Sequence, residues 1–595
     1  MKFSRSQTAT FAFFALVVAA VSAAETPARF DGPAELPRVY LQSSVADTPA
    51  PGKTLAIKAG DDLQRALDQA ACGDTLALEA GATFTGRFIL RKKNCDDSHW
   101  IVIRTSAPDS DLPPEGSRLT PCYAAVSSLP GRPDFHCHST KNVVAKLVCA
   151  GKAADGPIIL ASGANHYRLE ALEITRSESE AAITDLVTPE ARSPADHIVL
   201  DRVWLHGTAQ GETRRGVYLT GTAYVSIVDS FFTDFHCVAV TGSCTDSQAI
   251  GGGGGDLPSG PYKIVNNFLE AAAENILFGG GAATITPADI EIRHNYLFKP
   301  LLWKPGQPAF IGGTSGKPFI VKNLFELKNA QRLLFEANLL DYSWGGTGQR
   351  GFAFVLTPRN QGGNLCPLCR VTDITLRYCK VRHMGSALSI ADSPAGDGGL
   401  STAGERYSIH DMLFEDIDAT FYDGFGALAM LLSQGPQLRD VKIDHVTAFP
   451  SRVSIIVGAP RDQPLPSNFT FTNSIFTAAQ MEINSSGGRQ NCAFGMVQLG
   501  PAAVLKNCFT PLTFAHNAII SPNKPWPREN SFPKNQAAVG FVNYNQGKDG
   551  DYRLCKQKNQ PPPCTEPSPY AHAASDGKDL GADIDAIETA IRGVE

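Results

Sequence analysis

Apolar and polar residues alternate in short phrases along most of this chain, and one phrase returns many times. Three copies, KIVNNFL, IEIRHNYL and LLFEANLL, each hold two apolar residues one position apart, then an Asn, then a second apolar pair. Alternation of period two is typical of a strand with one buried face, and Asn favours tight bends. Asn267, Asn295 and Asn338 stand at the same place in the three copies. Each copy therefore predicts a strand, a bend and a second short strand.

The phrase can be followed through most of the chain. Its copies are HIVLDRVWL (from His197), VSIVDSFF (Val225), YKIVNNFL (Tyr262), IEIRHNYL (Ile290), LLFEANLL (Leu333), ITLRYCKV (Ile374), MLFEDIDA (Met412), VKIDHVTA (Val441) and FTFTNSIF (Phe469). No helical pattern lies between them, which excludes solenoids built from helices. An up-and-down antiparallel barrel would not place Asn at one point of each repeat. We predict an all-β chain folded as a right-handed parallel β-helix, with one phrase in each coil.

The N-terminal region differs from the repeats. Positive residues, an apolar run and the small residues Ser22-Ala23-Ala24 predict a secretory signal peptide over residues 1–24. Residues 25–52 are rich in Pro and Ala and predict a linker or an N-terminal extension. Asp61-Asp62 then starts a helical pattern that ends at Gly73, and its apolar face would cap the open end of the solenoid. We expect the β-helix over residues 53–545 and a closing segment over residues 546–595.

The chain has 14 Cys, and if it is exported we expect most of them to form disulfides, because an oxidising compartment favours these bonds. Close neighbours in the sequence suggest five bridges: Cys72–Cys95, Cys237–Cys244, Cys366–Cys369, Cys492–Cys508 and Cys555–Cys564. Cys366-Pro-Leu-Cys369 has no second CxxC to complete a zinc site and no thioredoxin-like context, so we interpret it as a bridge within a loop.

Composition excludes several classes of partner. The formal net charge is −6, which attracts neither nucleic acid nor an anionic membrane. The apolar run near the N-terminus is too short to span a bilayer, and no later segment is longer. No HExxH, GxSxG or phosphate-binding loop is present. We expect a secreted protein, extracellular or periplasmic, that acts as a monomer.

The phrases IVNNF, IEIRHNYLF and LLFEAN resemble the coils of the pectate-lyase-like right-handed parallel β-helix superfamily. The opening DDLQRALDQAACGDTLALEAGATFTG is similar to the start of its chondroitinase B and alginate lyase branch. The closing segment from Asp551 is similar to the end of many exported bacterial β-helix proteins. The resemblance covers residues 54 to 595. It implies the fold, and it leaves the activity open among lyases, hydrolases, esterases, epimerases and binding proteins.

Alternation also assigns charged residues to the outer wall. In IEIRHN, Ile290 and Ile292 point inward, so Glu291 and Arg293 point outward. The equivalent positions of later coils form a predicted column of Arg293, Glu336, Arg377 and Glu415. Alternating signs are typical of a solvated ladder of ion pairs, each worth about 0–1 kcal/mol. We keep Arg293 as a reserve catalytic candidate and Glu291 as a substrate-binding candidate.

The strand before each phrase carries a richer set of side chains. In LFELKNAQ, inward Phe325 and Leu327 leave Glu326 and Lys328 outward. The coil before offers Glu274 and Asn275, and the coil after offers Arg359, Asn360 and Gln361. A structural ion pair would explain Glu326 and Lys328 equally well, and Arg359 could equally anchor the loop to Cys366.

These residues are the types that β-elimination on a uronic acid needs: a base near C5 and cations to neutralise the carboxylate. By resemblance to chondroitinase-B-like lyases, Lys328 stands at the position of the base and Arg359 at that of the arginine. Asn275 and Glu326 stand at positions that bind Ca²⁺ in those enzymes. This chain departs from the pattern, because it has one Glu before the Lys and Arg359-Asn360-Gln361 in place of an RHG triplet.

We therefore expect an exported polysaccharide lyase that acts on uronate-containing glycans. A glycoside hydrolase is the second hypothesis, because Glu274, Asp289, Glu291 and Glu326 could supply two carboxylates at catalytic spacing. A non-catalytic glycan-binding or surface β-helix is the third. In each of the three, the partner is a polysaccharide.

Overall fold

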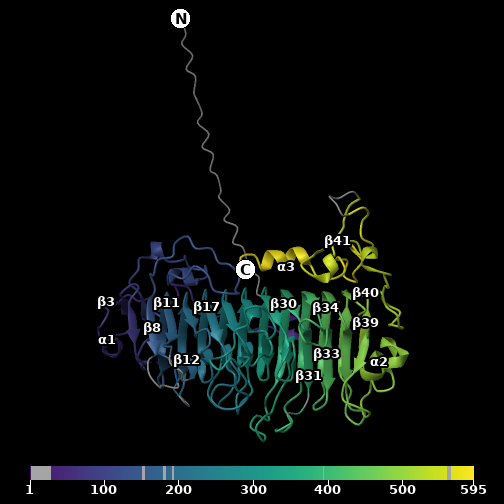
Figure 1. Ribbon diagram of the computed structural model, residues 1–595, viewed down its shortest axis with the longest axis horizontal. Coiled ribbons are helices and arrows are strands. Elements are labelled where there is room, and N and C mark those ends of the chain that lie inside the picture. Colours follow the sequence, from purple (N-terminus) through teal and green to yellow (C-terminus); the bar gives the residue numbers. More distant parts are fainter. Residues whose placement is uncertain are drawn as a thin grey trace.

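The structure is a computed structural model that describes residue 1 and residues 29–149, 155–178, 182–190, 193–392, 394, 396–558 and 564–595. The predicted signal peptide falls outside the described residues, apart from Met1. From Thr54 onward the chain forms a long stack of coils (Figure 1).

Most strands belong to two parallel sheets that run the length of the stack. The larger one, here called the wide sheet, has 24 strands: β3 (Thr54–Ile57), β4 (Thr75–Leu78), β5 (Thr83–Thr85), β7 (Ile101–Thr105), β8 (Ala145–Cys149), β10 (Asn165–Glu170), β11 (Leu172–Arg176), β13 (Ala195–Asp201), β14 (Trp204–His206), β16 (Thr222–Val228), β17 (Phe231–Phe235), β19 (Tyr262–Val265), β20 (Phe268–Ala271), β22 (Ala288–Arg293), β23 (Tyr296–Phe298), β25 (Ala330–Glu336), β26 (Leu339–Ser343), β30 (Val371–Met384), β32 (Glu405–Ile417), β34 (Arg439–Pro450), β36 (Ser467–Thr472), β37 (Ile475–Thr477), β39 (Leu512–Ala515) and β40 (Ala518–Ile520).

The smaller one, here called the narrow sheet, has 12 strands: β6 (Phe88–Leu90), β9 (Ile158–Leu160), β12 (Ile183–Pro189), β15 (Thr213–Tyr218), β18 (Gln248–Gly252), β21 (Glu274–Phe278), β24 (Phe325–Leu327), β29 (Phe352–Leu356), β31 (Ser386–Asp392), β33 (Ala427–Ser433), β35 (Val453–Gly458) and β38 (Ile483–Ser485).

The remaining elements are short. Three antiparallel ribbons are formed by β1 (Phe30–Asp31) with β2 (Ala34–Glu35), β27 (Gly345–Gly346) with β28 (Gln349–Arg350), and β41 (Phe541–Asn543) with β42 (Asp551–Leu554). The α-helices are α1 (Leu63–Gln69), α2 (Pro501–Cys508) and α3 (Ile584–Ala590). Single 3-10 turns are η1 (Asp109–Asp111), η2 (Pro121–Tyr123), η3 (Leu301–Trp303), η4 (Val497–Leu499), η5 (Gln536–Ala538) and η6 (Asn545–Gly547).

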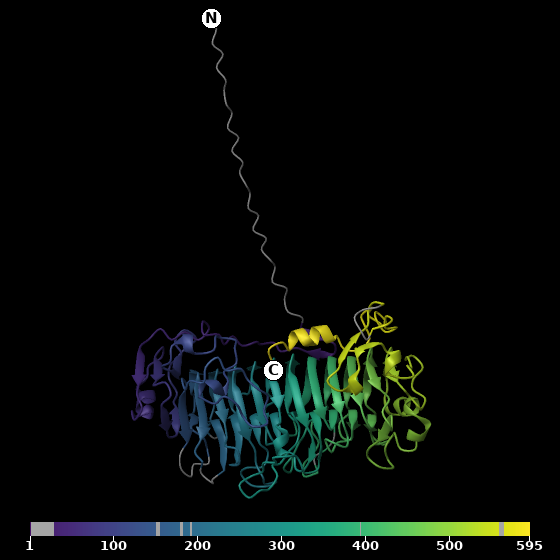
Figure 2. The same ribbon diagram turned by 45° about the horizontal axis from the view of Figure 1, so that its top comes forward.

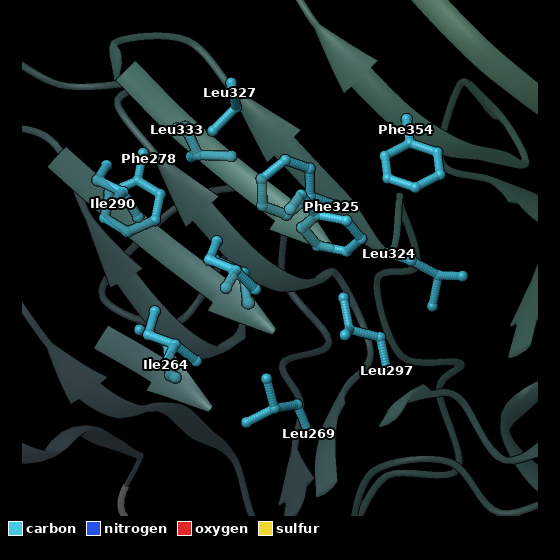
Figure 3. Packing of buried hydrophobic residues seen from close by; sticks show 14 of the residues in the cluster. Ile264, Leu269, Phe278, Ile290, Leu297, Leu324, Phe325, Leu327, Leu333 and Phe354 are labelled. Atoms are coloured by element: carbon cyan, nitrogen blue, oxygen red, sulfur yellow. The ribbon is translucent and has the colours of Figure 1, made fainter. Parts of the chain in front are cut away.

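The strand register confirms the predicted parallel β-helix. Each coil pairs in parallel with the next, so that Ile290 lies opposite Leu333 and Arg293 opposite Glu336. The inward residues form one continuous apolar core along the solenoid. Figure 3 shows its middle, where Ile264, Ile290 and Leu333 of the wide sheet belong to the same apolar cluster as Phe278 and Phe325 of the narrow sheet. Alternation therefore predicted the inward residues of these strands correctly.

Helix α1 closes the N-terminal end of the stack (Figure 1). The side chain of Asp62 accepts a hydrogen bond from the backbone N–H of Arg65, which caps the helix as the sequence predicts. Leu63 and Leu67 are buried in the main core. The helix ends at Gln69, a few residues before Gly73.

The three Asn of the repeated phrase form a buried ladder, as predicted. Asn267 N–H donates to Asn295 Oδ1 at 2.9 Å, and Asn295 N–H donates to Asn338 Oδ1 at 2.8 Å. All three side chains are completely buried. The bend itself is made by the preceding residue, which adopts left-handed backbone angles in each coil: Asn266, His294 and Ala337. The Asn side chains thus satisfy backbone groups that the bend leaves unpaired.

One predicted repeat was out of register. Arg377 lies opposite His410, not Glu415, because the phrase of that coil begins at Tyr407 rather than at Met412. Cys379 and Met412 occupy the place that Asn338 has one coil earlier, so no Asn marks the bend in these coils. Glu415 lies opposite Arg382 and accepts a hydrogen bond from the hydroxyl of Tyr552. The predicted column therefore runs Arg293, Glu336, Arg377, His410.

The N-terminal segment from Arg29 and the C-terminal helix α3 pack on the outer face of the wide sheet. The N-terminal segment is held there by Asp31, which pairs with Arg377 at 2.6 Å and with His410 at 3.1 Å. Helix α3 lies over β30 and β32, where Glu588 pairs with Lys380. Figure 2 shows α3 along this side of the stack. The wide sheet is therefore covered in its middle coils, whereas the narrow sheet faces away from these two segments.

Six disulfides join cysteines of the described chain, and five are those predicted from sequence neighbours. The sixth, Cys122–Cys137, closes the loop between β7 and β8. Cys149 and Cys379 are buried thiols. This disulfide content is typical of folding in an oxidising compartment. Among the helices that the structure describes, none is long and apolar enough to cross a membrane.

Candidate active site

The candidate site lies on the outer face of the narrow sheet, around β24. Phe325 and Leu327 point into the core, so the side chains of Glu326 and Lys328 leave the opposite face, as predicted. Lys328 Nζ lies 3.3 Å from Glu326 Oε1. The other oxygen of Glu326 accepts a hydrogen bond from Asn323 Nδ2 at 2.7 Å. Glu326 is therefore fixed between an amide and an ammonium group.

A second ion-paired group stands beside the first. Lys322 Nζ lies 2.5 Å from Asp246 Oδ1 and 3.4 Å from Glu274 Oε1. Gln248 Nε2 donates to the other oxygen of Glu274 at 2.9 Å. The Glu274 side chain is completely buried, whereas Asp246 keeps 32% of its side chain exposed. Two carboxylates from successive coils thus share one ammonium group.

These neighbours separate the pKa values of the two carboxylates. Burial raises the pKa of Glu274 to about 7, and the ammonium of Lys322 only partly offsets that rise. Burial also acts to raise the pKa of Asp246, but Lys322 outweighs it and the pKa is lowered. The site therefore gains one negative charge as Glu274 ionises near neutral pH.

Arg359 joins the site from the next coil. Its backbone N–H donates to the carbonyl of Lys328 at 3.2 Å, and its Nη1 donates to the carbonyl of Pro394 at 2.8 Å. Burial lowers the pKa of Arg359, and the charge of Glu326 opposes the shift. The structure thus brings Glu274, Glu326, Lys328 and Arg359 together on one face.

The two residues after Arg359 have different surroundings. Asn360 is buried, accepts the backbone N–H of Cys366 and donates to the carbonyl of Leu400. It therefore anchors the loop, the role that the sequence analysis considered for Arg359. Gln361 lies beside Gly280, next to the side chain of Lys328, and its buried Oε1 accepts no hydrogen bond within the described structure. Gln361 is thus the better placed of the two to contact a ligand.

Asn275 does not lie on the outer wall. Its side chain is completely buried inside the solenoid, donates to the carbonyls of Leu269 and Phe298, and accepts Lys299 Nζ at 3.0 Å. The chain bends at the start of β21, so Asn275 and Ile276 both point inward and strict alternation fails there. The predicted pairing of Asn275 with Glu326 is therefore wrong.

Arg293, Glu291 and Asp289 belong to a different face of the molecule. They lie in β22 of the wide sheet, where Arg293 pairs with Glu291 at 2.6 Å and with Glu336 at 3.3 Å. Together with Tyr40 of the N-terminal segment, Glu291 and Arg293 line a cavity of about 480 Å³. Asp289 binds Arg332. None of the three is therefore near Lys328.

The residues expected to hold Ca²⁺ do not fit that ion. Asn275 faces inward, and both oxygens of Glu326 are already bound by Asn323 and Lys328. Within the described chain, groups of three potential ligand atoms occur elsewhere, at Asp97–His166–His197 and at Glu212–Cys237–Cys244. The two cysteines of the latter are joined in a disulfide and offer no thiolate.

Sequence reasoning missed Asp246, Gln248, Lys322, Asn323 and the buried Lys299. The segment VKNLFELK held a usable signal, because Lys322 and Asn323 directly precede the strand that carries Glu326 and Lys328. Asp246 likewise precedes β18, and Gln248 is the first residue of that strand. Residues that enter a narrow-sheet strand fall outside the alternating pattern, so alternation carries no signal for them.

No protein-family model matches this chain. No curated protein matches it either. Among solved structures, the catalytic domain of a GH87 alpha-1,3-glucanase in complex with tetrasaccharides is 12% identical over 80% of this chain and 70% of its own, with a TM-score of 0.45. Alginate lyase from Paenibacillus sp. str. FPU-7 is 12% identical over 78% and 99%, with a TM-score of 0.27. Pectate lyase Pel9A is 9% identical over 90% and 97%, with a TM-score of 0.36. These neighbours are a glycoside hydrolase and two polysaccharide lyases.

Proposed function

We propose that this chain is a polysaccharide lyase that cleaves uronate-containing glycans by β-elimination. One observation carries the proposal: Lys328 and Arg359 lie on adjacent coils, joined by a hydrogen bond from the Arg359 backbone N–H to the Lys328 carbonyl, and the charge of Glu326, which pairs with Lys328 at 3.3 Å, also acts on the pKa of Arg359. A base and a guanidinium that share one face match the needs of this reaction better than they match a solvated wall. The Lys328 side chain is only 12% exposed, which is unusual for a lysine that serves solubility alone.

The chemistry assigns a role to each group. The carboxylate of the uronate binds against Arg359, whose planar guanidinium suits a carboxylate and stabilises the charge that develops when C5 loses its proton. Lys328 is the group that takes this proton. The electron pair of the C5–H bond forms the C4–C5 double bond, the C4–O bond breaks, the leaving oxygen takes a proton from water, and Lys328 returns its proton to the solvent. Glu326 and Asn323 hold Lys328 in place throughout.

Hydrolysis by two carboxylates is the second candidate, because Glu274 and Asp246 have pKa values that are pushed apart. Such a separation is typical of an acid paired with a base or nucleophile. Their oxygens lie 2.5 and 3.4 Å from the same ammonium nitrogen, so they are at most about 6 Å apart, a limit that admits only the closer, retaining spacing of a glycosidase pair. However, Glu274 is completely buried and bound by Gln248, so it has no access to a glycosidic oxygen. We therefore favour the lyase.

The test is a panel of uronate and neutral polysaccharides, followed both by ultraviolet absorbance and by reducing-sugar release. Elimination yields a double bond conjugated with the carboxylate, which absorbs in the ultraviolet, whereas hydrolysis yields reducing ends without that absorbance. Lys328→Ala should lower turnover at least about 10²-fold, the typical effect of losing a general base. A matched control is Lys442→Ala, because Lys442 forms a similar pair with Asp444 on the wide sheet. Full activity in Lys328→Ala would eliminate this mechanism.

A further inference from the structure

Lys322 occupies the centre of the acidic half of the site. It precedes β24, and its ammonium reaches Asp246, which precedes β18, and Glu274, which begins β21. Three successive coils thus each contribute one charged group to a single contact. The Lys322 side chain is 18% exposed, so its charge faces the outer wall without being open to bulk water.

Each partner stabilises the charge of the other. Burial acts to lower the pKa of Lys322, but Glu274 and Asp246 outweigh it and raise that pKa. The ammonium of Lys322 in turn lowers the pKa of Asp246. Lys322 is therefore a permanent cation at the place where the two carboxylates converge.

A divalent cation at this place would need the oxygens that Lys322 already uses. Ca²⁺ takes 6–8 oxygen ligands at about 2.3–2.6 Å, so it could not share Asp246 and Glu274 with an ammonium at contact distance. Three of the other carboxylate oxygens are also engaged, because Gln248 binds one oxygen of Glu274, and Asn323 and Lys328 bind the two oxygens of Glu326. Glu274 Oε1 accepts no hydrogen bond within the described structure, and the charged group nearest to it is the ammonium of Lys322 at 3.4 Å.

We propose that Lys322 is the built-in cation of this site, which neutralises Asp246 and Glu274 in place of a divalent metal. It does so through a fixed side chain, so the neutralisation is independent of ion concentration. That this neutralisation helps the site to bind an anionic sugar rests on the proposed lyase function, because two unneutralised carboxylates would repel a uronate. The replacement of the metal itself rests only on the contacts of Lys322.

Calcium binding to the full chain tests this proposal without any substrate. Titration calorimetry with Ca²⁺ is compared for the wild type, Lys322→Met and Glu274→Gln. In the wild type we expect no Ca²⁺ binding that depends on Glu274, so Glu274→Gln should change nothing. In Lys322→Met we expect a new binding event, because Asp246 and Glu274 then lack a counter-ion. Lys442→Met, which removes a paired lysine from the wide sheet, is the matched control and should gain no such event.

Two outcomes would overturn the proposal. One is wild-type binding of Ca²⁺ that Glu274→Gln abolishes, and this comparison remains decisive if Lys322→Met fails to fold. The other is a folded Lys322→Met that binds no Ca²⁺, because the carboxylates would then not form a cation site at all. Where a uronate polymer is cleaved, a chelator should leave the rate unchanged. If no uronate polymer is cleaved, the lyase assignment fails while the calcium result still decides the role of Lys322.

Discussion

Single residues at the bends decide which charges reach the candidate site. Lys299 is completely buried inside the solenoid, where its Nζ donates to Asn275 Oδ1 at 3.0 Å and to the carbonyl of Asn323 at 2.5 Å. Asn323 in turn holds Glu326. Burial lowers the pKa of Lys299 from 10.5 to about 7. An internal lysine therefore supports the strand entry from which the outer site is built.

Lys299→Met should change how stability depends on pH. Between about 7 and 10.5 the unfolded lysine is protonated and the folded one is not, so the wild type gains stability as pH rises. We expect the unfolding free energy of the wild type to rise relative to Lys299→Met by roughly 1.4 kcal/mol per pH unit at most in this window. Denaturant unfolding at about pH 7 and about pH 9 measures it.

Lys53→Met, at an exposed position, is the control. Its free energy of unfolding should depend on pH in the same way as that of the wild type. Parallel curves for the wild type and Lys299→Met would show that Lys299 does not titrate in this window.

At the scale of an element, the coil is held by a bend and a ladder. Left-handed residues such as His294 turn the chain, and Asn295 at the next position satisfies the backbone of its neighbours. Asn295 donates through Nδ2 to the carbonyl of Ile264 at 2.9 Å and accepts the N–H of Asn267. Each ladder residue thus serves two coils.

Asn295→Leu leaves two buried backbone groups unpaired, the carbonyl of Ile264 and the N–H of Asn267. Each unpaired group should destabilise the fold by about 1–3 kcal/mol. The thermal midpoint measures the loss. Asn543→Leu is the matched control, because Asn543 is exposed in β41 and should tolerate the change. A midpoint for Asn295→Leu that equals the control would contradict the ladder.

At the scale of the whole molecule, the two sheets differ in what covers their outer faces. The N-terminal segment and α3 both pack on the wide sheet, which leaves the candidate site on the narrow sheet. Ile587 of α3 is completely buried in a second apolar cluster that includes Leu413 of β32. The helix thus covers apolar side chains that the wide sheet would otherwise expose.

Ile587→Ala should cost about 2–5 kcal/mol of unfolding free energy, because it opens a cavity under the helix. Glu588→Ala at the next position removes only the pair with Lys380, in which the Glu588 side chain is 53% exposed, and should cost about 1 kcal/mol or less. Equal losses in the two variants would show that α3 is not packed as the structure has it.

Part of the candidate site could be predicted from the sequence. Glu326, Lys328 and Arg359 follow regular alternation in the middle of their strands or at the exit from them, so their outward direction was readable. Asn275 was not, because two consecutive residues point inward at the bend of β21. Asp246 and Lys322 reach the site from strand entries in different coils, and no local pattern relates them.

The sequence by itself determined the parallel β-helix and the position of the Asn ladder, because both follow from spacings within one coil, and close neighbours in the sequence suggested five of the disulfides. Tertiary structure alone decided that Met412 takes the place of a ladder Asn, that Arg293 faces the N-terminal segment, and that Lys322 lies between two carboxylates. The physical reason is that loops of unequal length separate the coils. Which residues stack on each other is then fixed by core packing and strand register, not by distance along the chain.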